Sequence, residues 1–292
     1  MTKTVNESVN PQRDELKNGG VVSQSLEVDA PTQALSQAPQ APIMNPMIEA
    51  QLAHRSIRAY SQSKLTAEQL KTLLTVARHG ATSAYQQQTT IIHVTDPKVR
   101  EQIYQASGQP YVGGDRGELF LFIADLYRNA KIREEAGVDI EDLARMNLFL
   151  QACQDTLIAA QNMVAAAESL GLGTVYLGSI TADPRLVIEA LKLPRLTYPL
   201  VGLLVGEPEQ SPQFKPRLPQ SIVVSENAYP DFENFHEALA EYDAVVQQYY
   251  DLRDTTKTIG TFTSRIEKLL GKGAADQSPV LEILHEQGLG LK

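Results

Sequence analysis

Residues 143–170 read LARMNLFLQACQDTLIAAQNMVAAAESL, and this stretch decides which kind of fold the chain can adopt. Apolar side chains such as Leu150 and Leu157 recur at helical spacing, while Ile158 and Met163 place apolar groups on other faces. Several alanines allow neighbouring elements to approach closely. A helix that is apolar on more than one face is buried or lies at an interface. The stretch therefore predicts one long central helix.

Short apolar segments on both sides of that helix predict strands. The segment 118–125 (ELFLFIAD) is almost continuously apolar, which is typical of a strand covered on both faces. The segment 90–95 (TIIHVT) is rich in β-branched residues, and its His93 is expected to have a structural role. Two further strands are predicted at 174–178 and 198–206.

Helices are predicted between these strands because their first residues match known caps. Thr66 and Gln69 form a capping box, and Asp96 and Asp183 each precede a proline at the first helical position. Further helical regions are expected at 232–250 and 262–287, and an irregular excursion at 127–141. Strands and helices do not alternate strictly, so we expect an α+β fold in which helices sandwich a sheet.

Composition narrows the class of protein. The chain has 292 residues, of which 42% are hydrophobic, and its net charge is −9. This charge argues against a general nucleic-acid binder, which needs a basic face. No apolar run is long enough to span a membrane, and the N-terminus lacks the pattern of a secretory signal. We therefore expect a cytoplasmic protein.

The first 45 residues differ in composition from the remainder. Residues 32–42 read TQALSQAPQAP, which is repetitive and poor in large apolar groups. Such a segment cannot bury enough surface to offset the entropy of ordering. We expect residues 1–45 to form a disordered Gln/Pro/Ala-rich tail and residues 46–292 to form a single domain. The single cysteine, Cys153, lies in the predicted long helix and is expected to be a buried hydrophobic residue rather than a nucleophile.

The segment His54-Arg55-Ser56-Ile57-Arg58 concentrates hydrogen-bond donors: two guanidinium groups, a hydroxyl and an imidazole. Such a group suits a phosphate or carboxylate, although a solvated basic turn would have the same composition. Polar or glycine-rich stretches also occur at 82–87, 172–179 and 215–217. The sequence holds no P-loop, no strand followed by GxGxxG, no zinc-ligand spacing and no GxSxG.

Several fragments occur in one order across roughly residues 50–290. They are HRSIR at 54–58, Gly108-Gln109, ESLGLGTVYLG at 168–178, LKLP at 191–194, KPRLP at 215–219 and ENAY at 226–229. In this combination the chain resembles the FMN-dependent nitroreductase superfamily, and more closely its NADPH-preferring subgroup of nitroreductase A and flavin reductases. The resemblance implies a three-layer sandwich with a mixed or antiparallel sheet, a long central helix, a C-terminal helical extension over about 231–292, and FMN at the interface of a homodimer.

The resemblance also implies the site residues. The residues carried over as FMN-binding are His54, Arg55, Ser56, Arg58, Thr82, Gln109, Tyr176, Leu177, Gly178, Ser179, Lys215 and Arg217. Thr82 replaces a serine of the family and keeps the hydroxyl, whereas Ser179 stands where a second glycine is frequent. Arg253 and, more approximately, Lys257 are carried over as the NADPH-binding residues. The residues leave open which cation meets the phosphate and which the ring.

The implied function is that of an enzyme. NADPH would pass hydride to bound FMN, which would then reduce nitroaromatics, quinones, free flavin or azo compounds in a ping-pong scheme. No protein acid or base is required, so no catalytic residue is named. There are two alternatives. One is a non-catalytic FMN-binding sensor or storage protein, over which the Arg253/Lys257 segment favours the enzyme. The other is a specialised member that fragments flavin or removes halogen, and the Lys-Pro-Arg-Leu-Pro loop argues against it.

Overall fold

The computed structural model describes residues 43–248, 260–269 and 279–292. The predicted tail therefore lies almost wholly outside the described residues, and so do Arg253 and Lys257. The chain divides into the segment Met1–Ile43 and a compact unit, Met44–Lys292, which contains every element described below. No helix in the described ranges is long and apolar enough to cross a membrane.

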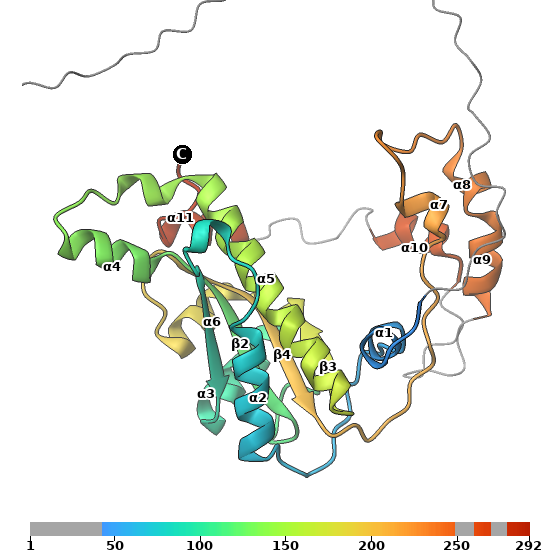
Figure 1. Cartoon of the computed structure of the whole chain (residues 1–292), viewed down its shortest axis with the longest axis horizontal. Coiled ribbons are helices and arrows are strands. Elements are labelled where there is room, and N and C mark those ends of the chain that lie inside the picture. Colours follow the sequence, from blue (N-terminus) through green and yellow to red (C-terminus); the bar gives the residue numbers. More distant parts are fainter. Residues whose placement is uncertain (1–42, 249–259, 270–278) are drawn as a thin grey trace, which may run out of the picture. The chain divides into compact units, whose positions relative to one another are not determined.

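The centre of the compact unit is a four-stranded antiparallel sheet with the strand order β1-β2-β4-β3 (Figure 1). Its strands are β1 (Thr89–Val94), β2 (Glu118–Asp125), β3 (Gly173–Leu177) and β4 (Thr197–Gly206). All four were expected from the sequence within a residue or two. The most apolar strands, β2 and β4, occupy the middle of the sheet, where both faces are covered.

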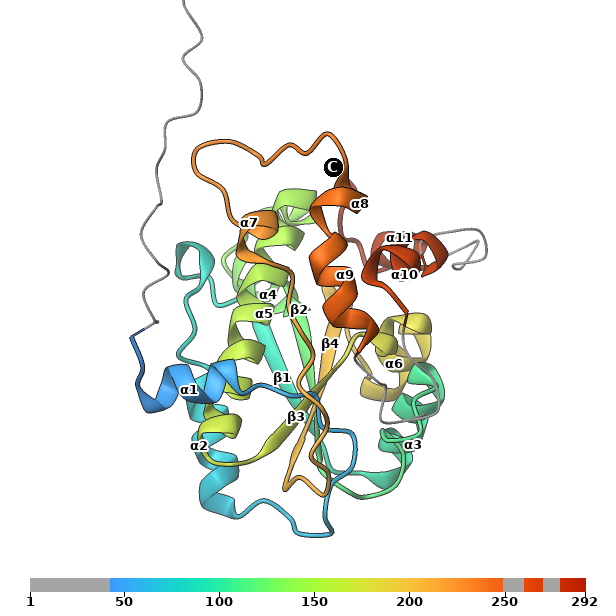
Figure 2. The ribbon, with the colours of Figure 1, turned by 90° about the vertical axis from the view of Figure 1, so that its right-hand side faces the viewer.

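Helices cover both faces of the sheet, which gives the predicted three layers (Figure 2). Alternate residues of β2 point to opposite sides. Leu119 and Leu121 pack in a cluster with α3 (Pro97–Ser107) and α6 (Pro184–Leu191), whereas Phe120 and Phe122 pack in a second cluster with α2 (Ala67–Ala77) and α5 (Met146–Ser169). The continuous apolar pattern of β2 is therefore the signature of its place between two helical layers.

The expected helix ends are largely confirmed. The Thr66 hydroxyl and the Gln69 side chain form the predicted capping box of α2, and Asp96 caps α3. The long helix begins and ends within three residues of its predicted limits, and it is preceded by a 3₁₀ turn, η2 (Glu141–Ala144). Leu150, Leu157 and Ile158 on this helix remain exposed in the single chain, so α5 is apolar beyond the face that it buries.

The prediction of an irregular excursion after β2 is wrong, because α4 (Tyr127–Glu135) is helical. Only Ala130 of this helix is buried, so its sequence shows no apolar periodicity. Polar pairs stabilise it instead: Arg128 contacts the Asp125 carboxylate at 2.9 Å, and Lys131 contacts Glu134 at 2.6 Å. A search for an apolar stripe cannot detect such a helix.

The remaining elements are short. The helix expected at 232–250 is divided, because Asn234 caps a first turn and Leu239 leaves helical geometry. The short elements are α1 (Pro46–Leu52), η1 (Ser83–Tyr85), η3 (Gly178–Ala182), α7 (Gln220–Val223), α8 (Phe235–Ala238), α9 (Ala240–Gln247), α10 (Phe262–Leu269) and α11 (Val280–Glu286). Of the predicted extension, α11 packs Ile283 and Leu284 against Phe149 of α5 and Tyr198 of β4.

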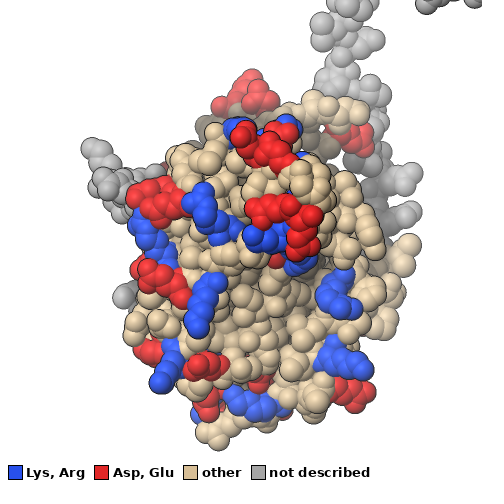
Figure 3. Space-filling model, turned by 90° about the vertical axis from the view of Figure 1, so that its left-hand side faces the viewer, with Lys and Arg blue, Asp and Glu red and all other residues tan. Residues whose placement is uncertain are grey.

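Acidic and basic side chains are interspersed on the face of the molecule shown in Figure 3. The described residues on the face in Figure 3 therefore form no continuous basic surface of the kind that nucleic-acid backbones require. Considering all described residues, several charged side chains pair across elements. Arg185 of α6, for example, lies 2.6 Å from both Glu282 and Glu286 of α11.

Candidate functional site

The basic segment 54–58 lies along the outer edge of β3. Ser56 and Thr174 form an isolated parallel bridge, and the Ile57 amide donates to the Thr174 carbonyl at 2.8 Å. This approach requires glycine at the first position of β3, since a Cβ on Gly173 would lie only 2.6 Å from Cγ1 of Ile57. The sheet edge thus fixes the middle of the basic segment.

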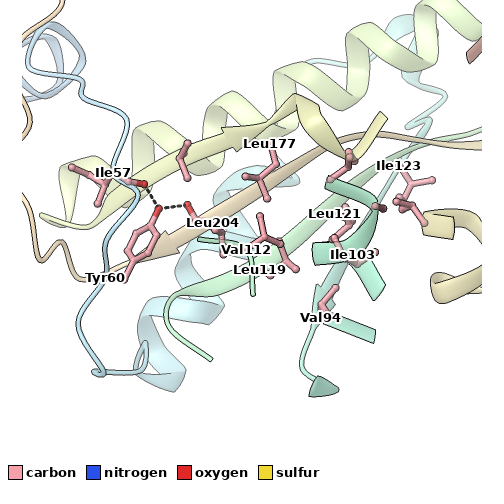
Figure 4. Packing of buried hydrophobic residues seen from close by; sticks show 14 residues of the cluster. Ile57, Tyr60, Val94, Ile103, Val112, Leu119, Leu121, Ile123, Leu177 and Leu204 are labelled. Carbon is pink, nitrogen blue, oxygen red and sulfur yellow. Dashed lines mark hydrogen bonds between the residues drawn. The ribbon is translucent and has the colours of Figure 1, made fainter. Parts of the chain in front are cut away.

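Tyr60 fixes the end of the same segment (Figure 4). Its side chain is almost fully buried, and its hydroxyl lies 2.7 Å from the Ile57 carbonyl and 3.2 Å from the Leu204 carbonyl. Burial raises the pKa of this phenol far above its ordinary value, so the hydroxyl remains a donor. Gly206 makes room for the ring, because a Cβ there would meet Tyr60 Cδ1 at 2.9 Å.

His54 is oriented by a carboxylate from the end of α5. Its Nδ1 lies 2.6 Å from Oε1 of Glu168, and the Thr174 hydroxyl donates to the same oxygen at 2.7 Å. A carboxylate only accepts, so Nδ1 of His54 carries a proton and Nε2 is left for another partner. The side chains of His54 and Glu168 are 31% and 13% exposed, so the pair is partly buried but still accessible.

A hollow opens beside this pair. His54, Arg55 and Glu168 line it, together with Gly171-Leu172-Gly173 and residues of the loop after β4. The lining from that loop includes Pro208, Gln210, Ser211 and Pro212. The basic segment and the start of the 207–219 loop therefore form two walls of one hollow.

Aromatic rings accompany the cations. The guanidinium carbons of Arg55 and Arg217 lie 6.0 and 5.9 Å from the centroid of the Phe214 ring, and that of Arg58 lies 5.8 Å from the Tyr111 ring. The Arg217 side chain also donates to the Lys215 carbonyl at 2.8 Å. The structure thus brings Arg55 together with the Lys215–Arg217 loop, and Arg58 together with the loop after α3.

Gln109 belongs to the loop after α3. It follows Gly108, which ends α3 in the left-handed conformation at a φ of 62°. The Gln109 carbonyl accepts from the Val112 amide at 2.9 Å, so a tight turn places Tyr111 next to Arg58. Gln109 is therefore two residues from Tyr111, whose ring contacts Arg58. The predicted residues Gln109 and Arg58 thus lie in the same region.

The residues at the end of β3, Tyr176 to Ser179, are the next predicted ligand contacts. The Tyr176 side chain turns toward α5, where its hydroxyl donates to Gln161 at 3.1 Å, and burial raises its pKa to about 12, helped by the Glu168 charge. Leu177 is buried in the core. A Cβ on Gly178 would meet no atom within 4 Å, and the buried Ser179 hydroxyl has no hydrogen-bond partner among the described residues. The buried side chain of Leu177 is therefore not available to a ligand, whereas Tyr176 is half-buried.

Of the predicted FMN-binding residues, only His54 and Arg55 line the hollow described above, and Thr82 lies in another place. It lines a different hollow with Arg78, Gln87 and Asp155, and the two hollows share no lining residue. Asp155 is buried and accepts from the amides of Ser83 and Gln88 at 2.8 and 3.2 Å. In the same turn, Ala84, Tyr85 and Gln87 all have positive φ, which is costly for residues other than glycine and concentrates at functional sites.

Two further expectations concern residues outside the site. Cys153 is half-buried rather than fully buried as expected, and this burial raises the pKa of its thiol to about 12, which fits a residue that is not a nucleophile. His93 stacks on Phe120 and lies 2.9 Å from Glu118, a structural arrangement within the sheet. Among the described residues, histidine, cysteine and carboxylate side chains form no group of three that could hold a metal ion.

Sequence reasoning missed the roles of Glu168, Thr174 and Phe214. In the sequence, Glu168 and Thr174 belong to the ESLGLGTVYLG fragment without a role of their own, and no motif includes Phe214. A carboxylate at the C-terminal end of a helix is unfavourable for the helix dipole, and this was the one local signal that Glu168 has a partner elsewhere. Nothing in the local sequence distinguishes Phe214 from an ordinary loop residue.

Two family models match the chain. The model described as "Nitroreductase family" matches residues 52–207, and "Nitroreductase family, C-terminal domain" matches residues 215–292. Together they cover the basic segment, the sheet, the long helix and the C-terminal extension.

Known proteins match over nearly their whole length. An "FMN reductase (NADPH)" of Bacillus subtilis is 41% identical over 76% of this chain and 90% of the relative, and an "Oxygen-insensitive NADPH nitroreductase" of Salmonella typhimurium is 35% identical over 84% and 98%. Among solved structures, NfrA1 nitroreductase from B. subtilis superimposes with a TM-score of 0.78 at 36% identity, covering 84% of this chain and 100% of that one. An NADPH:FMN oxidoreductase from Vibrio harveyi gives 0.74 at 34% identity, covering 85% and 100%.

Proposed function

The chain belongs to the nitroreductase family, and from this premise we propose that it is an NADPH-dependent flavoprotein oxidoreductase that holds FMN at the site built around residues 54–58. The relatives named as FMN reductase and as NADPH nitroreductase support both the cofactor and the electron donor. The same names support flavins and nitro compounds as electron acceptors. Quinones and azo compounds are proposed on chemical grounds, because they are also flat oxidants.

The residues present suit FMN. A phosphate needs strong hydrogen-bond donors, and the guanidinium groups of Arg55, Arg58 and Arg217 can supply them. A flat ring needs an open backbone surface, and the free space over Gly178 together with the unpartnered Ser179 hydroxyl meets that need. A buried hydroxyl without a partner is costly, so a ligand group that bonds to it stabilises the complex.

One observation supports the proposal most strongly. Arg55 and Arg217 are far apart in the sequence, yet both guanidinium groups approach the Phe214 ring. Two cations near each other repel, and an anion that bridges them removes the repulsion. Among the described residues, no carboxylate forms an ion pair with either arginine. The site is therefore charged in the way that an anionic ligand requires.

Bound FMN supplies the redox chemistry, because its ring accepts a hydride from a nicotinamide and returns two electrons to an oxidised acceptor. The protein positions its ligands. The backbone of residues 176–178 provides the surface for the ring, and the cations bind the phosphate and stabilise negative charge on the reduced ring. His54, oriented through Nδ1 by Glu168, presents Nε2 as a further group for the ligand.

The preference for NADPH is assigned to Arg253 and Lys257, which lie outside the described residues. A guanidinium can bind the 2′-phosphate through two donors, whereas a lysine provides a point charge. Replacing Arg253 with alanine should raise the Michaelis constant for NADPH more than that for NADH. An equal change for both nucleotides would remove Arg253 from the 2′-phosphate site.

A homodimer in the cytoplasm completes the proposal. Leu150, Leu157 and Ile158 expose apolar surface along α5, and Met47 and Leu52 of α1 do the same. A second copy of the chain would bury these side chains. It would also explain why Thr82 lies away from the other predicted residues, since a partner subunit can contribute it to the site. Light scattering of the full chain, compared with a Leu157→Lys variant, tests the dimer.

Steady-state kinetics tests the activity. Flavin-loaded protein should oxidise NADPH in the presence of a quinone or nitroaromatic, and double-reciprocal plots at several acceptor concentrations should be parallel, as expected when donor and acceptor use one place in turn. Intersecting lines would contradict the shared site. A flavin-loaded protein that does not oxidise NADPH with any of these acceptors would favour the non-catalytic alternative.

A further inference from the structure

Phe214 is the only aromatic residue in the segment 207–219, and it lies directly before Lys215. Phe214 is half exposed, at 50%. Two guanidinium groups approach it: Arg55 from the basic segment at 6.0 Å and Arg217 from its own loop at 5.9 Å. The ring therefore connects two parts of the site that are about 160 residues apart in the chain.

Among the residues that the structure describes, carboxylates hold other arginines of this chain, such as Arg116 and Arg185, but not these two. Within residues 43–248, 260–269 and 279–292, neither Arg55 nor Arg217 forms an ion pair. A carboxylate would orient a guanidinium but would also neutralise it and compete with an incoming phosphate. An aromatic ring attracts the cation through its quadrupole and leaves both the charge and the in-plane N–H donors free.

We propose that Phe214 is a positioning residue for the phosphate of FMN: it holds the guanidinium groups of Arg55 and Arg217 in place before the ligand arrives. The inference rests on the proposed function, because it takes FMN as the ligand. An arginine side chain that is ordered in advance loses less conformational entropy on binding, and this lowers the cost of forming the complex. The hydrogen bond from Nη1 of Arg217 to the Lys215 carbonyl orders the same guanidinium group.

The substitution Phe214→Leu is the decisive change, because leucine keeps apolar bulk and removes the ring. The full-length apoprotein is titrated with FMN and, separately, with riboflavin, which lacks the phosphate, and flavin fluorescence reports binding. We expect Phe214→Leu to weaken FMN binding roughly five- to a hundredfold, the effect of disordering two side chains, and to leave riboflavin binding unchanged. Phe214→Trp, which keeps an aromatic face, should bind FMN as the parent does.

Phe235→Leu is the matched control. Phe235 is also about half exposed, at 45%, and its nearest ring is Phe232 at a centroid distance of 5.1 Å rather than a cation. This variant should bind both flavins as the parent does. In a double-mutant cycle, Phe214→Leu should have a much smaller effect on FMN affinity when Arg55 and Arg217 are already alanine, because the ring then has no cation to hold.

The outcomes separate the inference from the function on which it rests. If the parent protein binds neither flavin, the proposed function itself fails. If the parent binds FMN and Phe214→Leu binds it equally well, the inference is overturned. It is also overturned if Phe214→Leu weakens FMN and riboflavin to the same extent, or if Phe214→Trp fails to restore affinity, because either result describes general packing rather than positioning of the phosphate-binding cations.

Discussion

Nδ1 of His54 lies 2.6 Å from Oε1 of Glu168, although the two residues are 114 positions apart. The contact joins the first residue of the basic segment to the last turn of α5. It orients the imidazole, and the Thr174 hydroxyl, bound to the same oxygen, connects the pair to β3. The long helix therefore supports the binding site directly, in addition to forming the core.

Replacing Glu168 with glutamine tests this support. The amide keeps the shape of the side chain but turns a charge-assisted hydrogen bond into a neutral one, so FMN binding should weaken roughly three- to tenfold. Titration of the apoprotein with FMN measures the change. Glu189→Gln, at an exposed position of α6, is the control and should retain parental affinity. If Glu168→Gln also retains it, the contact does not orient a ligand-binding group.

Gly173 is the first residue of β3 and Gly178 directly follows its last residue. Replacing each with alanine should have different effects on stability and on FMN binding. The new Cβ at position 173 would overlap the Ile57 side chain at 2.6–2.9 Å, so Gly173→Ala should lower the free energy of unfolding by about 1–3 kcal/mol. Urea denaturation measures this, and adding Ile57→Ala should restore part of the loss.

Gly178→Ala is the matched comparison. Its Cβ would meet no protein atom within 4 Å, so stability should not change, whereas a flat ring that lies on this backbone would be displaced and FMN affinity should fall. Unchanged affinity in this variant would place the ring elsewhere.

The arginines of the basic segment should decide whether the protein retains flavin. With both Arg55 and Arg58 replaced by alanine, the phosphate loses at least two charge-assisted hydrogen bonds, and FMN affinity should fall on the order of a hundredfold or more. The variant should therefore be purified without colour. Lys71→Ala/Lys98→Ala removes the same charge from exposed positions of α2 and α3 and should remain yellow. Stoichiometric FMN in the arginine variant would refute the assigned role.

Alkaline pH should destabilise the fold through Cys153. Burial raises the pKa of this thiol from 9.0 to about 12, so above pH 9 the unfolded chain releases a proton that the folded protein keeps. The stabilisation is complete below pH 9 and is lost as the pH rises toward 12. Urea denaturation should show stability falling from pH 9 in the parent, and only from about pH 10 in Cys153→Ala, where Tyr198, with a pKa raised to about 12, still contributes. Identical pH profiles would exclude the thiol as the source.

The fold could be predicted well where local chemistry determines structure. The limits of α3 follow from Asp96-Pro97 and Gly108, and β2 follows from its unbroken apolar run. The helix α4 could not be predicted, because surface ion pairs rather than an apolar face stabilise it. Propensity and periodicity report burial, and a helix that buries one alanine gives almost no such signal.

The candidate site could likewise be predicted only in part. The basic segment could be identified because its donors are adjacent in the sequence. The groups that orient these donors, Glu168 and Phe214, come from distant parts of the chain, and only the folded sheet and the loop after β4 bring them together. Spacing along a sequence contains no information about contacts that tertiary structure creates.

The central claim is that this chain binds FMN and reduces it with NADPH. The most direct measurement is the visible absorption spectrum of the purified full-length protein without oxygen, recorded before and after addition of one equivalent of NADPH. We predict the spectrum of oxidised flavin at one FMN per chain, and its rapid bleaching by NADPH. A colourless protein that takes up no added FMN, or a yellow protein whose spectrum NADPH leaves unchanged, would contradict the account.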